Sequence, residues 1–340
     1  ELFGSWPAVG EKITSKGDFI DQMMGQLDRT KFEIETVPPV SKEELTVLKG
    51  GVRIFTDYAE APFLSFARNR LQAVMFPVPV IGLDPRIQGT MVHLVLELFW
   101  KAVKTSEALK AFSNDELFEL VQAKVNEGSE KLLNKLIWRY GARLISLEQM
   151  RLTTLICEWL ELEKKRDHEF EVLGFEEPHD INIGGVPLTV KVDRRDRIFL
   201  NAEKTEFRDV VHDYKTGNSM RMSSLNAENL NEPQLPIYAT QIDFTSKGVK
   251  SLDGVALAQV NHRSLGFHTR SNFSAILVSD TGKKPRREDI DNEEKWVAQC
   301  AAWDDVLKGM SKGFMNGVAD LSLLGKDLPM GYEYLAPLAR

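Results

Sequence analysis

Two acidic residues and a lysine occupy neighbouring runs of alternating hydrophobic and polar residues. Asp193 ends the run at residues 186–193, on the side opposite its valines. Asp213 and Lys215 fall on one side of the run at residues 207–215, because side chains alternate along a strand. A hard divalent cation prefers carboxylate oxygens, and phosphodiester hydrolysis needs a metal-activated water molecule and a cation near the developing charge. These residues therefore predict a metal-dependent site that cleaves phosphodiesters.

Three further polar residues stand out on predicted helices. His93 interrupts an otherwise apolar helix at residues 89–104, while Gln234 and Tyr238 lie one turn apart on a short helix. Each has a simpler interpretation when taken alone. A histidine on an apolar helix is more often hydrogen-bonded to a carbonyl than bound to a metal, and the other two residues fit a helix face packed on a sheet. Asp193 with its charged neighbours is also compatible with a hairpin turn.

The elements that would position these residues form a helical part followed by strands. Capping boxes at residues 113–116 and 146–149 predict two long helices, the first ending near Tyr140. Other helices are expected at residues 18–27, from 41, at 56–72 with a break at Pro62, at 89–104, at 232–242 and at 292–317. Alternation predicts strands at residues 169–176, 181–183, 186–193, 197–200, 207–214, 254–260 and 266–270. This order predicts an α/β fold: a central mixed sheet flanked by helices, with an N-terminal helical region.

The composition is that of a globular protein. The chain has 340 residues, of which 43% are hydrophobic, and its net charge of -7 argues against indiscriminate binding of polyanions. No run is apolar enough to span a membrane, no secretory signal is visible, and two cysteines cannot form a disulfide framework. We therefore expect no membrane association and a cytoplasmic location. Because the first residue is Glu1, we also expect a fragment of a larger protein.

Four segments occur in an order that is typical of one family. They are residues 89–93 (GTMVH), 192–194 (VDR), 213–217 (DYKTG) and 234–239 (QLPIYA). Together they resemble the RecB-like nuclease branch of the PD-(D/E)xK superfamily, and most closely the C-terminal nuclease domain of AddB-type and related DNA repair proteins. The resemblance covers roughly residue 56 to the C-terminus. It implies a restriction-endonuclease-like core.

The resemblance also implies roles for particular residues. His93, Asp193 and Asp213 would bind Mg²⁺ or Mn²⁺, with the backbone carbonyl of Tyr214 as a further ligand, and Lys215 would orient or activate the attacking water. Gln234 and Tyr238 would line the site near the DNA backbone. An acidic residue on the preceding strand would be Glu176, with Glu171 as the alternative. Contacts to DNA would come from Arg194 and Arg195, and from the scattered basic residues Arg68, Arg70, Lys204, Arg221 and 283–287.

The chain departs from the family pattern at its proposed cluster positions. Many relatives hold an iron–sulfur cluster with cysteines at positions matched here by Ala61 and by the tail at residues 330–340, where no cysteine occurs. Because thiolates are the ligands of such clusters, we predict no iron–sulfur cluster. The two segments are still expected to pack together through apolar contacts. A second departure is Val190, where relatives commonly have glycine.

These observations predict the domain organisation and the function. Residues 1–50 would be a linker or a remnant of an upstream domain, and residues 51–340 a nuclease domain with a helical part at about 51–168, a sheet core at about 169–270, and a C-terminal helix and tail at 290–340. The function would be that of a DNA exonuclease acting on single strands or DNA ends in repair or recombination, fed by a helicase-like upstream domain or partner. The alternatives are an inactive module that binds DNA or a partner, and an unrelated α/β protein with surface carboxylates.

Overall fold

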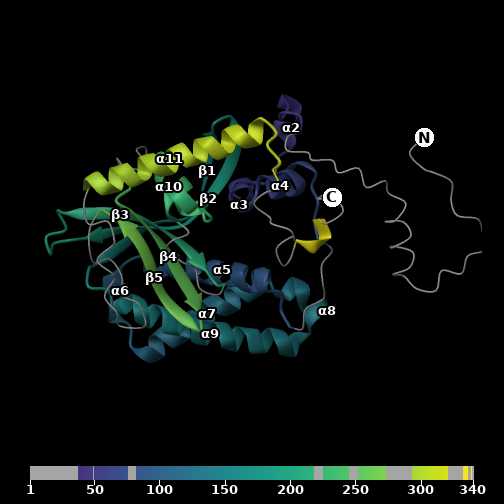
Figure 1. Ribbon diagram of the computed structural model, residues 1–340. Coiled ribbons are helices and arrows are strands. Elements are labelled where there is room, and N and C mark those ends of the chain that lie inside the picture. The colour runs from purple at the N-terminus through teal and green to yellow at the C-terminus, as the bar shows by residue number, and fades with distance from the viewer. Residues whose placement is uncertain are drawn as a thin grey trace, which may run out of the picture.

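The computed structural model describes residues 37–48, 50–75, 82–217, 225–244, 252–272, 293–320, 332–335 and 338. Within these ranges it has the predicted fold class, because a helical N-terminal region precedes a five-stranded mixed sheet with helices on both faces (Figure 1). The expected helix at residues 18–27, Arg221 and the basic residues 283–287 lie outside the described ranges.

Short helical elements open the described chain. Ser41 accepts a hydrogen bond from the backbone N–H of Glu44 at 3.1 Å, so the predicted capping box starts a helix. The predicted break at Pro62 is also present, since proline lacks an N–H and is tolerated only in the first turn of a helix. The elements are α2 (Lys42–Val47), α3 (Arg53–Glu60), α4 (Pro62–Ser65) and a π-helical turn, η1 (Phe66–Arg70).

A helical layer follows, formed by α5 (Pro85–Val103), α6 (Ser106–Ala111), α7 (Asn114–Lys131), α8 (Ile137–Tyr140) and α9 (Ala142–Lys164). The predicted capping box at Ser113 starts α7, although α7 ends before Tyr140. The predicted start at Ser146 is wrong, because α9 already begins at Ala142. Gly141, with a φ of 75°, ends α8 and is followed directly by α9. No helix in these described ranges is long and apolar enough to cross a membrane.

The sheet has the strand order β1-β2-β3-β4-β5, and only the β3–β4 pair is parallel. Its strands are β1 (Phe170–Ile183), β2 (Val186–Phe199), β3 (Phe207–Lys215), β4 (Gly254–Asn261) and β5 (Ser264–Ser271). The separate short strands predicted before residue 200 are in fact two continuous strands of 14 residues each. The charged residues after Asp193 therefore belong to β2 and do not form a turn, because ladder pairing continues through them to both neighbours.

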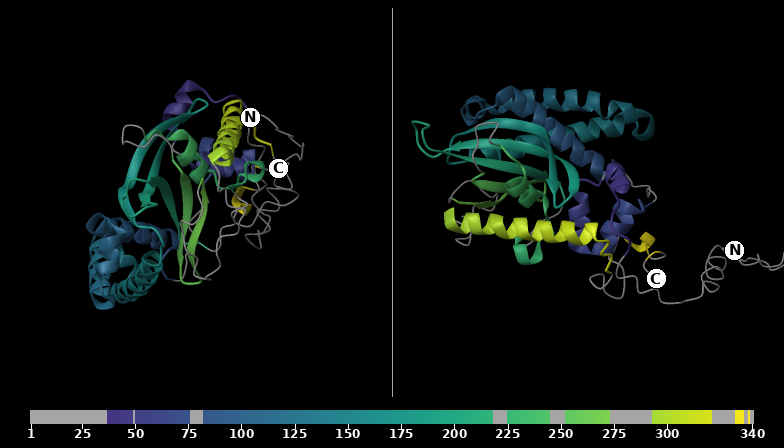
Figure 2. Two further views of the ribbon diagram at one scale, coloured as in Figure 1. Left: turned by 90° about the vertical axis from the view of Figure 1, so that its left-hand side faces the viewer. Right: turned by 90° about the horizontal axis from the view of Figure 1, so that it is seen from above.

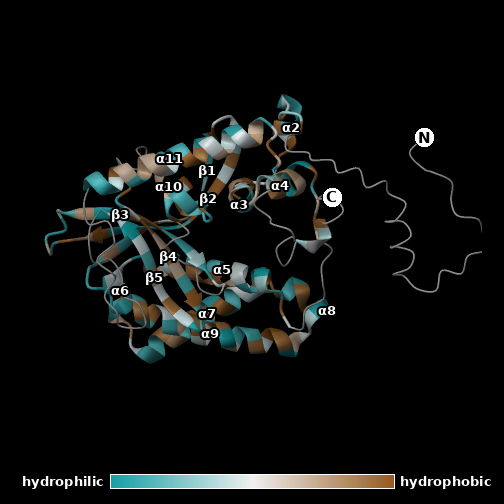
Figure 3. Ribbon diagram, in the orientation of Figure 1, coloured by the Kyte–Doolittle hydropathy of each residue, from teal (hydrophilic) through white to brown (hydrophobic). Residues whose placement is uncertain are grey.

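Helices cover both faces of the sheet (Figure 2), and each face has its own hydrophobic core. On one face, α5, α7 and α9 bury Trp100 and Trp159 against strand residues such as Val210. On the other face, α10 (Gln234–Gln241) and α11 (Glu293–Met315) bury Trp303 against the alternate side chains of β2 and β3. Hydrophilic and hydrophobic residues alternate along α7 and α9, as expected of helices with one buried side (Figure 3). The sheet thus lies between two helical layers.

A third, smaller cluster joins the N-terminal helices to the C-terminal tail; we call it the terminal cluster. It consists of Ala61, Phe63, Leu64, Ala67 and Leu335, the last of which lies in the short helical turn η7 (Glu333–Leu335). The Tyr332 hydroxyl donates a hydrogen bond to Glu60 at 2.7 Å, and Arg68 lies over the Tyr332 ring. The predicted apolar packing between these two segments is confirmed.

Candidate active site

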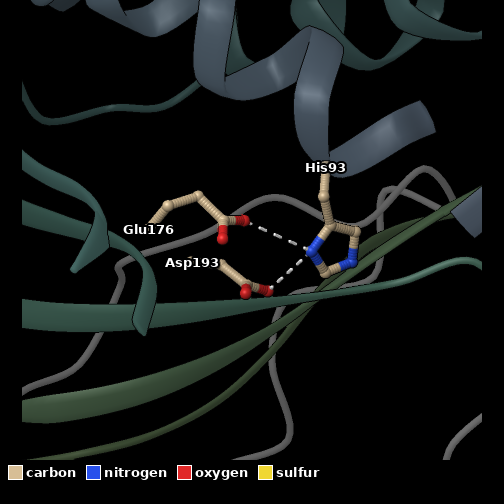
Figure 4. Close-up of side chains that lie close together, drawn as sticks. All are labelled: His93, Glu176 and Asp193. Carbon is tan, nitrogen blue, oxygen red and sulfur yellow. Dashed lines mark ion pairs between the residues drawn. The ribbon is translucent and has the colours of Figure 1, made fainter. Parts of the chain in front are cut away.

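His93 reaches the sheet from the middle of α5. Asp84 caps this helix by accepting a hydrogen bond from the backbone N–H of Arg86 at 2.8 Å, and Pro85 occupies its first position. The neighbours Val92 and Val95 are buried in the core, which fixes the rotation of the helix about its axis. As a result the imidazole ring of His93 points to the strands β1 and β2 (Figure 4).

Glu176 and Asp193 meet this ring from the sheet. The pairs Phe175–Arg194 and Glu177–Val192 place Glu176 opposite Asp193 in the ladder. His93 Nδ1 lies 3.4 Å from Asp193 Oδ2 and 3.8 Å from Glu176 Oε1 (Figure 4). One potential ligand atom from each of the three residues lies within 4.8 Å of the others. Glu176 also has a φ of 47°, a conformation that is uncommon for a side-chain-bearing residue and is often found at functional sites.

The backbone of Tyr214 holds two of these side chains in place. Its N–H donates to Asp193 Oδ2 at 2.8 Å, and its carbonyl accepts from His93 Nε2 at 2.9 Å. With its Nε2–H bound to this carbonyl, the ring presents Nδ1 to the two carboxylates, and a partner on one ring nitrogen in this way selects the other as the possible metal ligand. His93 is therefore bonded to a carbonyl, as in the simpler interpretation, and also faces two acidic groups.

The contacts within this cluster shift the pKa values of His93 and Glu176. Burial acts to lower the pKa of His93, but its hydrogen bonds to Asp193 and Glu176 raise that pKa to about 10. Burial likewise acts to raise the pKa of Glu176, and contacts with His93 and Lys191 lower it overall. The three residues therefore hold a proton between two carboxylates. A divalent cation satisfies the same negative charge, and the imidazole–carboxylate donor set suits Mg²⁺ or Mn²⁺.

Asp213 and Lys215 lie next to this cluster on β3. Arg194 of β2 pairs with His212 of β3 in an antiparallel ladder, so Asp193 lies opposite Asp213. Asp213 is only 1% exposed, and in the described part of the chain the only partner of its carboxylate is Lys215, whose Nζ lies 2.8 Å from Oδ2. Burial raises the pKa of Asp213 to about 6. Asp213 is not among the three residues that share the 4.8 Å cluster, but its buried oxygen without a donor fits a further ligand of a cation.

A chain of hydrogen bonds connects Lys215 back to β2. Lys215 Nζ donates to Gln234 Oε1 at 2.8 Å, Gln234 Nε2 donates to the Tyr238 hydroxyl at 2.7 Å, and this hydroxyl donates to the carbonyl of Lys191 at 2.6 Å. Gln234 and Tyr238 therefore reach the site from α10, one turn apart. Tyr238 is buried, and its hydroxyl holds Gln234 in place.

The sequence reasoning missed Lys191. Its ammonium lies 2.5 Å from Glu176 Oε2, so it holds one oxygen of that carboxylate while His93 faces the other. Lys191 stands two residues before Asp193 and so shares its side of the strand, which is the signal that could have identified it. The structure also places Glu176, and not Glu171, in the cluster.

Arg194 and Arg195, which the sequence predicted to contact DNA, both have buried side chains. Arg194 is 1% exposed and forms ion pairs with Glu163 and Asp196 at 2.6 Å each. Arg195 lies 3.8 Å from Glu177 and packs over the ring of Phe244. Their observed contacts all lie within the protein interior.

The other basic residues predicted to contact DNA have acidic partners. Arg68 is paired with the buried Asp57, Arg70 with Glu44 at 2.6 Å, and Lys204 with Glu107 at 2.9 Å. Their charges are thus largely compensated within the fold. Arg221 and residues 283–287 lie in parts of the chain that the structure does not describe.

A sheet that carries a histidine–carboxylate cluster beside a buried aspartate–lysine pair has the side chains of a possible metal site. The comparison with protein families agrees: residues 54–319, more than half of the chain, match the model of the PD-(D/E)XK nuclease superfamily. The chain belongs to this superfamily. The comparison with curated proteins returned no match.

Proposed function

We propose that this protein is a divalent-metal-dependent deoxyribonuclease that acts as an exonuclease on single strands or DNA ends. The observation that carries the proposal is the cluster of His93, Glu176 and Asp193 beside the buried pair of Asp213 and Lys215. Membership of the PD-(D/E)XK nuclease superfamily supports it, because a nuclease takes nucleic acid as its substrate.

The ion would be held by His93 Nδ1, Asp193 and Asp213, with Glu176 beside them. The Tyr214 carbonyl, predicted as a further ligand, accepts from His93 Nε2 on the opposite edge of the ring, so it would position the imidazole and not bind the same ion. The bound ion would lower the pKa of a water molecule and offer Lewis-acid contact to the scissile phosphate. The imidazole makes Mn²⁺ as suitable as Mg²⁺. Ion binding would require His93 Nδ1 to lose its proton, which the hydrogen bond from Nε2 to the Tyr214 carbonyl supports.

Lys215 would act on the attacking water or on the phosphoryl oxygens. An ammonium has three N–H groups, and those directed at Asp213 and Gln234 account for two of them. The third is left for a water molecule or a phosphoryl oxygen. Gln234 and Tyr238 position this ammonium through their hydrogen bonds and keep it from rotating away. A fixed cation of this kind stabilises the charge that develops during phosphodiester cleavage.

The same proposal includes a cellular role, a partner and the type of cofactor. The resemblance to RecB-like and AddB-type nuclease domains supports a cytoplasmic role in DNA repair or recombination. It also supports a helicase-like upstream domain or partner that delivers the DNA strand. The absence of cysteine at Ala61 supports a site whose cofactor is the divalent ion and not an iron–sulfur cluster.

The deciding experiment is degradation of end-labelled single- and double-stranded DNA with Mg²⁺, Mn²⁺ or EDTA. Wild type should release labelled products only with a metal. Asp213→Asn and Lys215→Ala should each lose at least about a hundredfold in rate, because each removes a group that acts on the developing charge. Asp180→Asn and Lys308→Ala, which change an exposed aspartate and an exposed lysine away from the site, are the matched controls.

Two outcomes would contradict the proposal. If neither metal supports cleavage while DNA still binds, the chain is an inactive DNA-binding module. If Asp213→Asn cleaves as fast as Asp180→Asn, the activity does not come from this site.

A further inference from the structure

A pocket of about 200 Å³ lies between α5, α9 and the turn from β4 to β5. Its lining is mostly polar: Gln88, Arg151, Thr216, Asn261, His262 and Arg263. The aliphatic side chains of Val92, Leu155 and Val260 complete it. A site with cationic and amide donors on one side and an apolar wall on the other suits a small anionic ligand with a hydrophobic part.

This pocket adjoins the candidate active site. Val92 directly precedes His93 on α5, and Thr216 directly follows Lys215 after β3. Consecutive α-carbons are about 3.8 Å apart, so the backbone of two pocket-lining residues directly borders that of two residues of the site. The helix approaches closely here, because a β-carbon added at Gly89 would lie 3.2 Å from the Thr216 hydroxyl oxygen.

The turn at Gly217 is fixed by donors from β4. Asn261 Nδ2 donates to the Gly217 carbonyl at 2.7 Å, and Gln259 Nε2 donates to the same oxygen at 3.3 Å. Asn261 Oδ1 in turn accepts from the backbone N–H of Arg263 at 3.0 Å. The pocket wall that carries Arg263 is therefore tied to the strand end that carries Lys215.

Of the three basic side chains that line the pocket, two have a carboxylate partner. Arg151 forms two hydrogen bonds with Glu148, at 2.9 and 2.5 Å, and His262 lies 3.4 Å from Glu158. Arg263 has no carboxylate partner among the described residues. A guanidinium in a pocket without a carboxylate is available to an anion, and its planar fork matches the oxygens of a phosphate group.

We propose that this pocket binds a phosphate group of the DNA strand next to the scissile phosphodiester, with Arg263 as its main cation. Thr216 and Asn261 lie beside it as further polar groups. The inference rests on the proposed nuclease function, and it adds a specific subsite for the substrate. A terminal phosphate and an internal phosphodiester share this chemistry, so the experiment separates them.

The test is binding of fluorescein-labelled oligo-dT in EDTA, followed by fluorescence anisotropy, so that no cleavage occurs. Three oligonucleotides are compared: one with a 5′-phosphate, one with a 3′-phosphate and one with neither. Arg263→Ala should weaken binding about tenfold and reduce the salt dependence by about one phosphate contact. Arg143→Ala, an exposed arginine on the same helix as Arg151 but outside the pocket, is the control and should bind like wild type. Arg263→Lys should restore binding in part, because it keeps the charge without the fork.

The pattern across the three oligonucleotides identifies the phosphate. A loss confined to one phosphorylated end supports a terminal monoester, and an equal loss for all three supports an internal phosphodiester. Arg263→Ala binding all three as tightly as Arg143→Ala overturns the proposal. If wild type fails to cleave DNA but its binding depends on Arg263, the proposed nuclease function fails and the phosphate site stands. If wild type cleaves and Arg263 is without effect, the phosphate site alone fails.

Discussion

Replacing Arg194 with methionine tests whether this arginine is part of a buried charge network, and not of a DNA-binding surface. Its guanidinium lies 2.6 Å from both Glu163 and Asp196, and it stacks over the Trp100 ring at 4.1 Å. Arg166 pairs with the same two carboxylates at 2.9 Å each. The network thus contains two guanidiniums and two carboxylates, with the buried His212 imidazole 3.1 Å from Asp196, and because burial lowers the pKa of His212 its charges balance. Methionine preserves much of the side-chain volume but leaves one buried carboxylate uncompensated.

The expected loss of stability follows from that imbalance. Breaking a buried ion pair by removing one partner costs about 3–5 kcal/mol, because the remaining charge stays in a poorly solvated environment. The lost stacking on Trp100 adds roughly 1 kcal/mol. Although burial acts to raise it, the charge of Arg194 holds the pKa of Asp196 well below its usual 3.8, which shows how strongly the two groups interact. Arg194→Met should therefore lower the free energy of unfolding by about 4–6 kcal/mol.

Urea unfolding followed by circular dichroism measures this loss, and a double-mutant cycle attributes it. Glu163→Gln alone leaves Arg194 and Arg166 with one carboxylate and should also destabilise. The double variant Arg194→Met/Glu163→Gln leaves one pair of opposite charges, Arg166 with Asp196, so its loss should be smaller than the sum by about 2–3 kcal/mol.

Two results would refute this reasoning. Arg194→Met within about 1 kcal/mol of wild type would mean that the network contributes little to stability. A folded, stable Arg194→Met with weakened DNA binding and a reduced salt dependence would return Arg194 to the DNA-contacting role that its position after Asp193 first indicated.

Three further outcomes are expected. Leu335→Ala, which removes a fully buried side chain from the terminal cluster, should lower the free energy of unfolding by about 2–3 kcal/mol. Leu338→Ala, at a leucine that is 47% exposed, should change it by less than about 0.5 kcal/mol, and equal losses would contradict the cluster. Because the pKa of His93 is raised from 6.5 to about 10, ion binding between these pH values should release a proton, so the affinity for Mn²⁺ measured by calorimetry should rise with pH. His93→Gln should remove most of that dependence, and an unchanged dependence would exclude His93 as a ligand. Lys191→Met should slow DNA cleavage by about three- to tenfold, because a charge-assisted hydrogen bond to Glu176 is lost at a partly solvated position. Lys308→Met, an equally exposed lysine paired with Asp304 on α11, should cleave at the wild-type rate; parallel losses in the two variants would argue against a role for Lys191.

The sequence predicted the structure correctly where a local pattern determines which side of a strand or helix a residue faces. Alternation along residues 207–215 placed Asp213 and Lys215 on one side of a strand, and the spacing of Gln234 and Tyr238 placed both on one side of a helix. The apolar composition of residues 89–104 predicted a buried helix with one histidine, and α5 is this helix. Each of these patterns has a period that the backbone geometry imposes directly.

The sequence was misleading where tertiary contacts decide. A run of charges at residues 193–196 has the composition of a surface turn, yet Arg194 and Asp196 are buried because Glu163 and Arg166, some 30 residues earlier, supply matching charges. No pattern near residues 193–196 indicates that charged partners lie so far away in the sequence. The same limit applies to Lys191, whose contact with Glu176 depends on the register of β1 against β2.

Tyr214 shows why the buried network and the candidate site depend on each other. Its hydroxyl accepts a hydrogen bond from Arg194 at 3.1 Å, so its side chain is anchored in the charge network. Its backbone N–H and carbonyl bind Asp193 and His93. Because a peptide group cannot move independently of an anchored side chain, the network fixes the positions of two potential metal ligands. Burying Arg194 and Asp196, which the sequence alone would place on the surface, is therefore part of how β2 and β3 form the site.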